Sequence, residues 1–168
     1  MAKTYLDELV EYPAKVIQKI AADAHCVGFL VNKAFADVTE SDFDKVLDDF
    51  IFDFQYVDKT TQETAAYIWT ELEIPDILTQ QIKNTKLYVT VACHKQFMKL
   101  DHKVFPGVMG NRRDNLARYI DKLLNFSDIF GIGPLALCSV QTIASPNEFT
   151  IKELEYTVPD FNMRELDK

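Results

Sequence analysis

Histidines and cysteines are the residues of this chain best suited to bind a metal or to attack a substrate. They are His25, Cys26, Cys93, His94, His102 and Cys138. Zinc sites usually appear in a sequence as close pairs such as C-x₂-C or H-x₃-H, and this chain has no such pair. The pattern favours buried cysteines and ordinary histidines, so we expect neither a metal nor a cofactor.

Cys93 offers the sharpest enzymatic alternative, a nucleophilic thiol activated by a histidine. Neighbouring residues in a strand point to opposite faces, so His94 would not activate Cys93. His25 or His102 would have to do so, and the sequence places neither beside the thiol. We therefore predict that the chain is not an enzyme, and we keep a small cytosolic enzyme with a cysteine or carboxylate site as an alternative.

Two further clusters suggest ligand sites but lack the spacing that such sites require. The acidic residues Asp48, Asp49 and Asp53 lack the central glycine and terminal glutamate of a calcium loop, so a solvated sheet edge explains them better. The segment Phe130-Gly-Ile-Gly-Pro134 is too short for a phosphate-binding loop and no helix follows it. Its glycines and proline indicate a turn.

Arg112 and Arg113 form the oddest local feature, because they open a predicted helix. Cations near a helix N-terminus oppose its dipole, at a cost of about 0.3–1 kcal/mol each. One explanation is a local ion pair with Asp114 or simple solvation. The functional explanation is a bridge to an acidic surface on a neighbouring subunit, and we take these arginines as candidate interface residues.

The helix that carries these arginines lies between segments that we expect to be strands. Residues 111–125 place apolar side chains at helical spacing, and Asn111 or Asp114 can cap the first turn. Residues 86–94 precede it as a strand, and residues 135–143 and 149–158 follow as a hairpin. The last strand changes apolar parity, which predicts a bulge near Lys152-Glu153 or a change of sheet.

The first half of the chain shows helical spacing and then two strands. Thr4 and Asp7 resemble a capping pair, and Pro13 indicates the first turn of a second helix within residues 4–35. Ser41 can cap a short helix over residues 41–47. The alternating residues 50–57 and 67–74 predict two strands joined by a hairpin loop at 58–63, with Pro75 ending the second. A helix over residues 62–72 is the alternative.

Length and charge limit the protein class. The length of 168 residues suits one compact domain. The net charge of −8 argues against a protein that binds nucleic acid over its whole surface. Three cysteines fit a reducing compartment, and no apolar run approaches the roughly 20 residues of a membrane span, so we expect a soluble chain.

The expected fold class is α+β, a mostly antiparallel sheet packed against a C-terminal amphipathic helix, with an N-terminal helical segment. We divide the chain into a helical segment or arm at 1–40, an α+β domain at 41–162 and a polar tail at 163–168.

The order of these elements over residues 48–162 resembles the tail-terminator, or tail-completion, proteins of long-tailed bacteriophages. The resemblance lies in the strand at Leu87–Val91, the helix at Asn111–Asn125 and the two final strands. It implies a structural virion protein that closes as a ring, usually a hexamer, on the end of the tail tube. The implied partners are further copies of itself, tail tube and neck proteins, and DNA passing through the lumen. The implied location is the virion, and the host cytoplasm during assembly.

Two departures from this pattern suggest contact arms. The helical segment at 4–35 and the linker from His94 to Gly110 are both longer than the pattern needs. An arm docked on a neighbouring subunit would bury apolar residues of the first helix. The candidate subunit interface is therefore Leu6, Leu9, Val10, Arg112, Arg113 and Asp114. A head-tail adaptor or stopper is the close alternative, and a host-directed binding module using the arginines is another.

Overall fold

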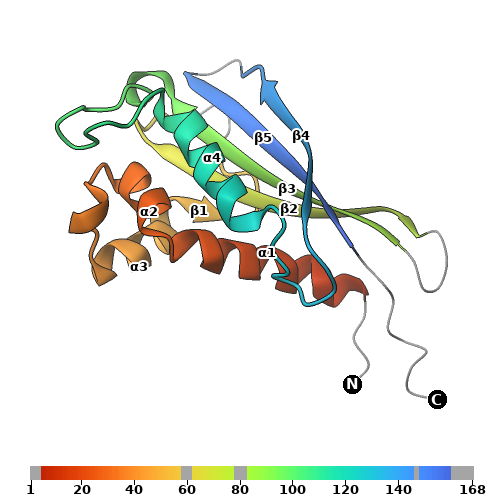
Figure 1. The fold of residues 1–168 in the computed structure, drawn as a ribbon. Helices are drawn as coiled ribbons and strands as arrows, with labels where there is room; N and C mark the ends of the chain where they lie inside the picture. Colours follow the sequence, from red (N-terminus) through yellow and green to blue (C-terminus); the bar gives the residue numbers. More distant parts are fainter. Residues whose placement is uncertain (1–4, 58–61, 78–82, 146–147, 160–168) are drawn as a thin grey trace.

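Helices pack on one face of a five-stranded sheet in the computed structural model (Figure 1). The structure describes residues 5–57, 62–77, 83–145 and 148–159. The described helices are α1 (Tyr5–Ala21), α2 (Ala24–Val31), α3 (Glu40–Asp49) and α4 (Arg112–Leu124), with short 3₁₀ turns η1 (Phe35–Asp37) and η2 (Lys95–Phe97). The strands are β1 (Ile51–Phe52), β2 (Ala66–Ile77), β3 (Lys83–His94), β4 (Ala136–Ile143) and β5 (Phe149–Val158).

The sheet has the strand order β1-β2-β3-β5-β4, in which β1 runs parallel to β2 and the other neighbours are antiparallel. This confirms the predicted α+β class, with a mostly antiparallel sheet and N-terminal helices. The predicted place of the amphipathic helix at the C-terminus is wrong, because α4 lies in the middle of the chain and two strands follow it. Those strands pair as the predicted hairpin.

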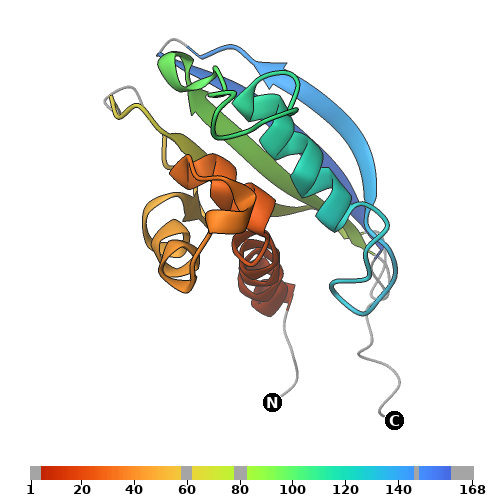
Figure 2. The same ribbon diagram turned by 60° about the vertical axis from the view of Figure 1, so that its left-hand side comes forward.

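The two faces of the sheet have different environments. We call the face covered by helices the inner face, where Leu87, Val89 and Val91 of β3 join the main hydrophobic core. Helices α1, α2, α3 and α4 all contribute to that core. Figure 2 shows the arrangement of these helices and the sheet from a second side. On the opposite, outer face, a smaller cluster gathers at one end of the sheet. It contains Val57, Tyr67, Trp69, Ala92, Phe149 and Ile151.

This two-sided packing explains the parity change in β5. Phe149 and Ile151 join the outer cluster, whereas Leu154, Tyr156 and Val158 join the main core. The strand stays in register with β3 along its whole length, so the bulge predicted at Lys152-Glu153 is wrong. The irregularity lies in β4 instead, between Leu137 and Ser139.

Helix α1 is continuous, and the prediction that Pro13 starts a second helix is wrong. A proline inside a helix removes one backbone hydrogen bond, but burial of Tyr12, Val16 and Ile20 in the main core outweighs that loss. The proposed capping residue Thr4 lies outside the described residues. Since α1 and α2 both enter the core, the N-terminal segment packs against the α+β unit rather than extending from it as a whole.

The segment from α3 to the start of β2 differs from the prediction in two details. Thr39, not Ser41, caps α3, and it forms a reciprocal capping box with Asp42. Strand β1 has only two residues and runs parallel to β2, so the predicted hairpin is wrong. Residues 58–61 of its expected loop lie outside the described residues.

The chain leaves the sheet after Phe52, and the aromatic side chain of Tyr56 packs back against the outer face. The Tyr56 ring stacks on Phe52 with centroids 4.2 Å apart and lies 4.9 Å from Tyr67. The prediction that Pro75 ends the second strand is wrong, because β2 continues through Pro75 to Ile77, with a register shift between Glu73 and Asp76. A proline at such an irregularity removes no regular ladder bond.

Candidate interaction surfaces

Arg112 is enclosed in the protein, with 1% of its surface exposed. Its Nε donates to the Phe97 carbonyl at 2.9 Å, one terminal nitrogen donates to the Phe29 carbonyl, and the other donates to Asn32 Oδ1 at 2.7 Å. The guanidinium also lies over the Phe97 ring, 3.7 Å from its centroid. These contacts join the start of α4 to the end of α2 and to η2.

This position corrects the prediction for Arg112. A side chain buried inside one subunit cannot meet an acidic surface on another, so Arg112 is not an interface residue in this fold. Burial lowers the pKa of its guanidinium to about 10, which leaves the group charged at neutral pH. The dipole mismatch at the helix start marked an unusual residue, but only the tertiary structure supplies the three oxygens that surround it.

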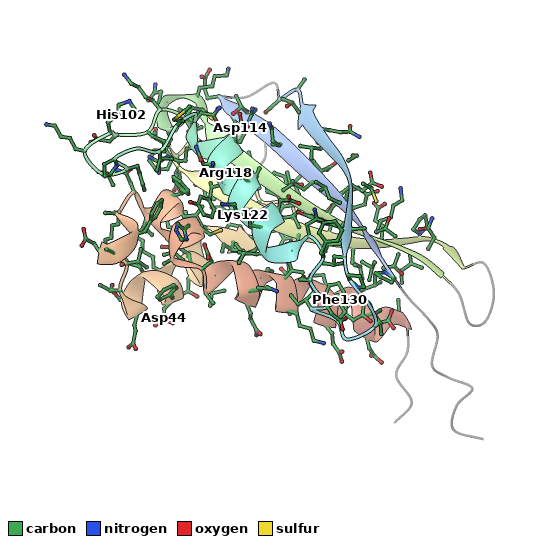
Figure 3. All side chains as sticks on the ribbon, in the orientation of Figure 1. Asp44, His102, Asp114, Arg118, Lys122 and Phe130 are labelled. Atoms are coloured by element: carbon green, nitrogen blue, oxygen red, sulfur yellow. The ribbon has the colours of Figure 1, made fainter. Side chains whose placement is uncertain are left out.

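Arg113 and Asp114 form a local ion pair, the first of the two explanations for the arginines. Arg113 donates to Asp114 at 3.0 Å, and its side chain is only 12% exposed. Lys152 of β5 reaches the same carboxylate at 2.8 Å. Burial alone would raise the pKa of Asp114, but hydrogen bonds from Lys152, Asn111 and Arg113 lower it to about 2. Asp114, labelled in Figure 3 at the start of α4, thus ties α4 to the sheet.

The apolar candidates on α1 lie at the surface. Leu6 is 69% exposed and Val10, one helical turn later, is 73% exposed, while Leu9 is half-buried. The next turn is fixed in place, because the Tyr12 ring stacks on Phe130 with centroids 4.0 Å apart. Phe130, labelled in Figure 3, comes from the loop between α4 and β4. The exposed pair therefore stands on an anchored helix.

Two exposed apolar residues lie on loops and are not among the predicted interface residues. Phe126 follows α4 with a φ of 61° and is 78% exposed. Met109 is 86% exposed in the segment between η2 and α4, the long linker that the sequence marked as a possible contact arm. Neither residue belongs to a periodic pattern, so no sequence signal distinguishes it from a residue folded into the core.

The candidate catalytic thiol has no access to a substrate. Cys93 is fully buried, and burial raises the pKa of its thiol to about 12 even though Arg112 lies nearby. Cys26 is also buried, with a pKa raised by burial and by Asp23. Cys138 is exposed, and its sulfur lies 2.8 Å from the Thr157 hydroxyl.

The histidines lie in three different settings. His25 stacks on Tyr119 with centroids 4.4 Å apart, and His94 contacts Phe149 edge to face on the outer side of the sheet. His102 lies on the exposed segment before α4, as labelled in Figure 3. Among the residues that the structure describes, no group of three or more His, Cys, Asp or Glu side chains could hold a metal ion.

The remaining candidate clusters match their simpler explanations. Asp48, Asp49 and Asp53 are exposed at the end of α3 and just after β1. Gly131 and Gly133 have positive φ angles, and the Gly133 backbone N–H donates to Asp128 at 2.9 Å in a turn.

A protein-family model with the description YomW matches residues 23–158, from just before α2 to the end of β5. No curated protein matches the chain. In the part of the chain that the structure describes, no helix is long and apolar enough to cross a membrane.

Proposed function

The chain belongs to the YomW family, whose model matches most of its length. We propose that it is a structural virion protein of the head-tail junction of a long-tailed bacteriophage. Copies of the chain form a ring, six in number as the resemblance implies, and this ring terminates the tail tube. The protein acts by matching one ring surface to the next, without a catalytic residue. The order of strand, helix and hairpin that carries the resemblance is present in β3, α4, β4 and β5.

The exposed apolar surface of α1 is the observation that carries this proposal. Leu6 and Val10 together place two large apolar side chains in water on one helical face. Burial of apolar surface is favourable by roughly 25 cal/mol per Å², so covering this pair on a neighbouring copy stabilises an assembly. The family match begins at residue 23, after α1, so the support for this surface comes from its exposure alone.

A ring requires a heterologous contact, in which α1 of one copy docks on a different surface of the next. The anchored position of α1 suits this role, because a helix held by the Tyr12–Phe130 stack loses little conformational freedom on docking. Each copy carries a net charge of −8, so copies repel one another at low salt. Assembly should therefore strengthen as moderate salt screens this repulsion.

The alternative of an enzyme centred on Cys93 receives no support from the geometry, because the thiol is enclosed and its pKa is raised. The alternative of a host-directed binding module cannot use Arg112, since its side chain is buried inside the protein. The choice between a tail terminator and an adaptor or stopper depends on whether the ring binds the end of a tail tube or a portal.

Sedimentation velocity and negative-stain microscopy of the full chain, alone and with purified tail tubes, test the proposal. We expect a ring in solution or on the tube end. The double variant Leu6→Lys/Val10→Lys should prevent ring formation, because lysines on the docking face cannot be buried without loss of hydration.

The matched control is Gln18→Lys, which adds a lysine at an exposed position of the same helix. It should assemble like the unaltered chain. A chain that stays monomeric both alone and with tail tubes, or a double variant that forms normal rings, would contradict the proposal.

A further inference from the structure

Strand β4 lies at one end of the sheet, with β5 as its only strand neighbour among the described residues (Figure 1). An edge strand presents a row of N–H and C=O groups without a ladder partner, which can pair with another strand. The residues from Val140 to Ile143 are all exposed. Val140 is 50% exposed and Ile143 is 37% exposed, so apolar side chains accompany the open backbone.

The sequence of β4 lacks the features that usually keep an edge from pairing. Proteins protect such edges with lysines and other charges, prolines, bulges or a very short strand. Strand β4 reads Ala-Leu-Cys-Ser-Val-Gln-Thr-Ile, with no charged residue and no proline. Its one irregularity lies at Cys138, and from Ser139 to Ile143 it pairs regularly with β5. Five regular residues at the open edge are therefore unprotected.

In a second copy of the chain, the strand that suits this open edge is β4 of that copy. The opposite end of the sheet is occupied by β1 at Ile68 and Trp69, and Thr70 beyond it is fully buried. Farther along β2, Pro75 and a register shift interrupt the strand. A head-to-tail pairing of the two sheet ends therefore lacks a regular open strand on one side.

We infer that two copies pair through their β4 strands, antiparallel, across a twofold axis at Gln141. This register uses all five regular residues and places Ser139 opposite Ile143 of the partner subunit, and Val140 opposite Thr142 of the partner subunit. Residues of equal parity meet, so the inner faces of the two sheets are continuous. Val140 and the partner's Val140 are then diagonal neighbours and cover each other.

This contact goes beyond the proposed ring and does not depend on it. A twofold contact uses the same patch on both copies and closes after two subunits, whereas ring growth needs a heterologous contact. The ring contact proposed above uses α1, which lies elsewhere in the fold from β4 (Figure 1). The two contacts can therefore be disrupted separately.

The first test measures the mass of the full chain by sedimentation equilibrium over a dilution series. The β4 pairing predicts a dimer, and Val140→Lys should raise its dissociation constant about tenfold or more, because it makes two lysines diagonal neighbours across the paired strands. Val10→Lys, which adds the same charge at an exposed valine of α1, should leave the dimer unchanged while weakening rings. A chain that is monomeric at all concentrations, or a dimer insensitive to Val140→Lys, overturns the inference.

The second test reads the register with a short bismaleimide crosslinker. In a Cys138→Ser background, Gln141→Cys should crosslink readily, because directly opposed residues have Cβ atoms about 4.5–5.5 Å apart. The unaltered chain should not crosslink through Cys138, since the two copies of that residue lie about 20 Å apart in this register. Absence of the Gln141→Cys crosslink, or an efficient crosslink through Cys138, rules out the proposed register.

Discussion

At the scale of single residues, Arg112 holds together parts of the chain that are far apart in sequence. Its guanidinium bonds to Phe29 and Asn32 at the end of α2, and to Phe97 in η2. Burying a cation at a helix N-terminus is unfavourable in itself, and the three oxygens and the Phe97 ring offset that cost. A planar guanidinium can bond in three directions within one plane, which a lysine cannot do.

Replacing Arg112 should therefore destabilise the fold. We expect Arg112→Met to lower the free energy of unfolding by about 2–4 kcal/mol, because it strands the buried oxygens that the guanidinium satisfies. Arg112→Lys should recover only part of this loss. Urea unfolding followed by circular dichroism measures the change. Arg113→Ala is the control, and its free energy of unfolding should fall by no more than about 1 kcal/mol. Equal losses for Arg112→Met and Arg113→Ala would contradict the structural role of Arg112.

At the scale of elements, the start of α3 shows how a local signal and a tertiary contact combine. Thr39 and Asp42 form the capping box that the helix itself requires. Asp42 also accepts two hydrogen bonds from Lys33 Nζ, at 2.6 and 2.8 Å, so the cap joins α3 to Lys33, the second residue after α2. The hydrogen bond from Lys33, with those from Thr39, lowers the pKa of Asp42 to about 2.

This lowered pKa gives a defined pH dependence. A carboxylate whose pKa is lower in the folded state than its ordinary 3.8 adds stability above that value and loses it as the pH falls toward about 2. Asp42→Asn should therefore be less stable than the unaltered chain at neutral pH, and the difference should shrink as the pH falls from 3.8 to about 2. Thermal unfolding across this range measures it. Asp44→Asn, at an exposed position of the same helix, serves as the control, and a difference that persists at the lowest pH would contradict the assignment.

At the scale of the whole molecule, the sheet is covered by helices on its inner face and only partly covered on its outer face. The N-terminal helices, α4 and four strands, β1, β2, β3 and β5, share the main core, which encloses two of the three cysteines. The surface left over contains the exposed residues of α1 and the open edge at β4. These are the two places where we propose contacts with further copies.

The distribution of cysteines gives a test of the whole packing arrangement. At neutral pH, one thiol of the native chain should react rapidly with a thiol reagent, because Cys138 is exposed while Cys26 and Cys93 are buried. All three should react after unfolding in urea. Mass spectrometry of the labelled peptides identifies the sites. Rapid native labelling of Cys93, whose thiol pKa is raised to about 12, would mean that the core opens easily.

Local patterns determined much of the fold. The strands around Leu87 and in the final hairpin, and the helix capped by Asn111, follow from periodicity and capping, which act over a few residues and survive in any tertiary context. These features depend on neighbours in the chain, so the sequence alone was sufficient.

The tertiary structure decided which partners those elements meet. Pro13 stays inside a helix because distant core residues hold that helix, and β1 pairs parallel to β2 instead of forming a hairpin with it. Arg112 is internal because α2 and η2 bring oxygens to it from residues 15 to 83 positions away in the sequence. Such long-range contacts leave no periodic trace near the residue, and their combined burial and hydrogen bonding outweigh local preference.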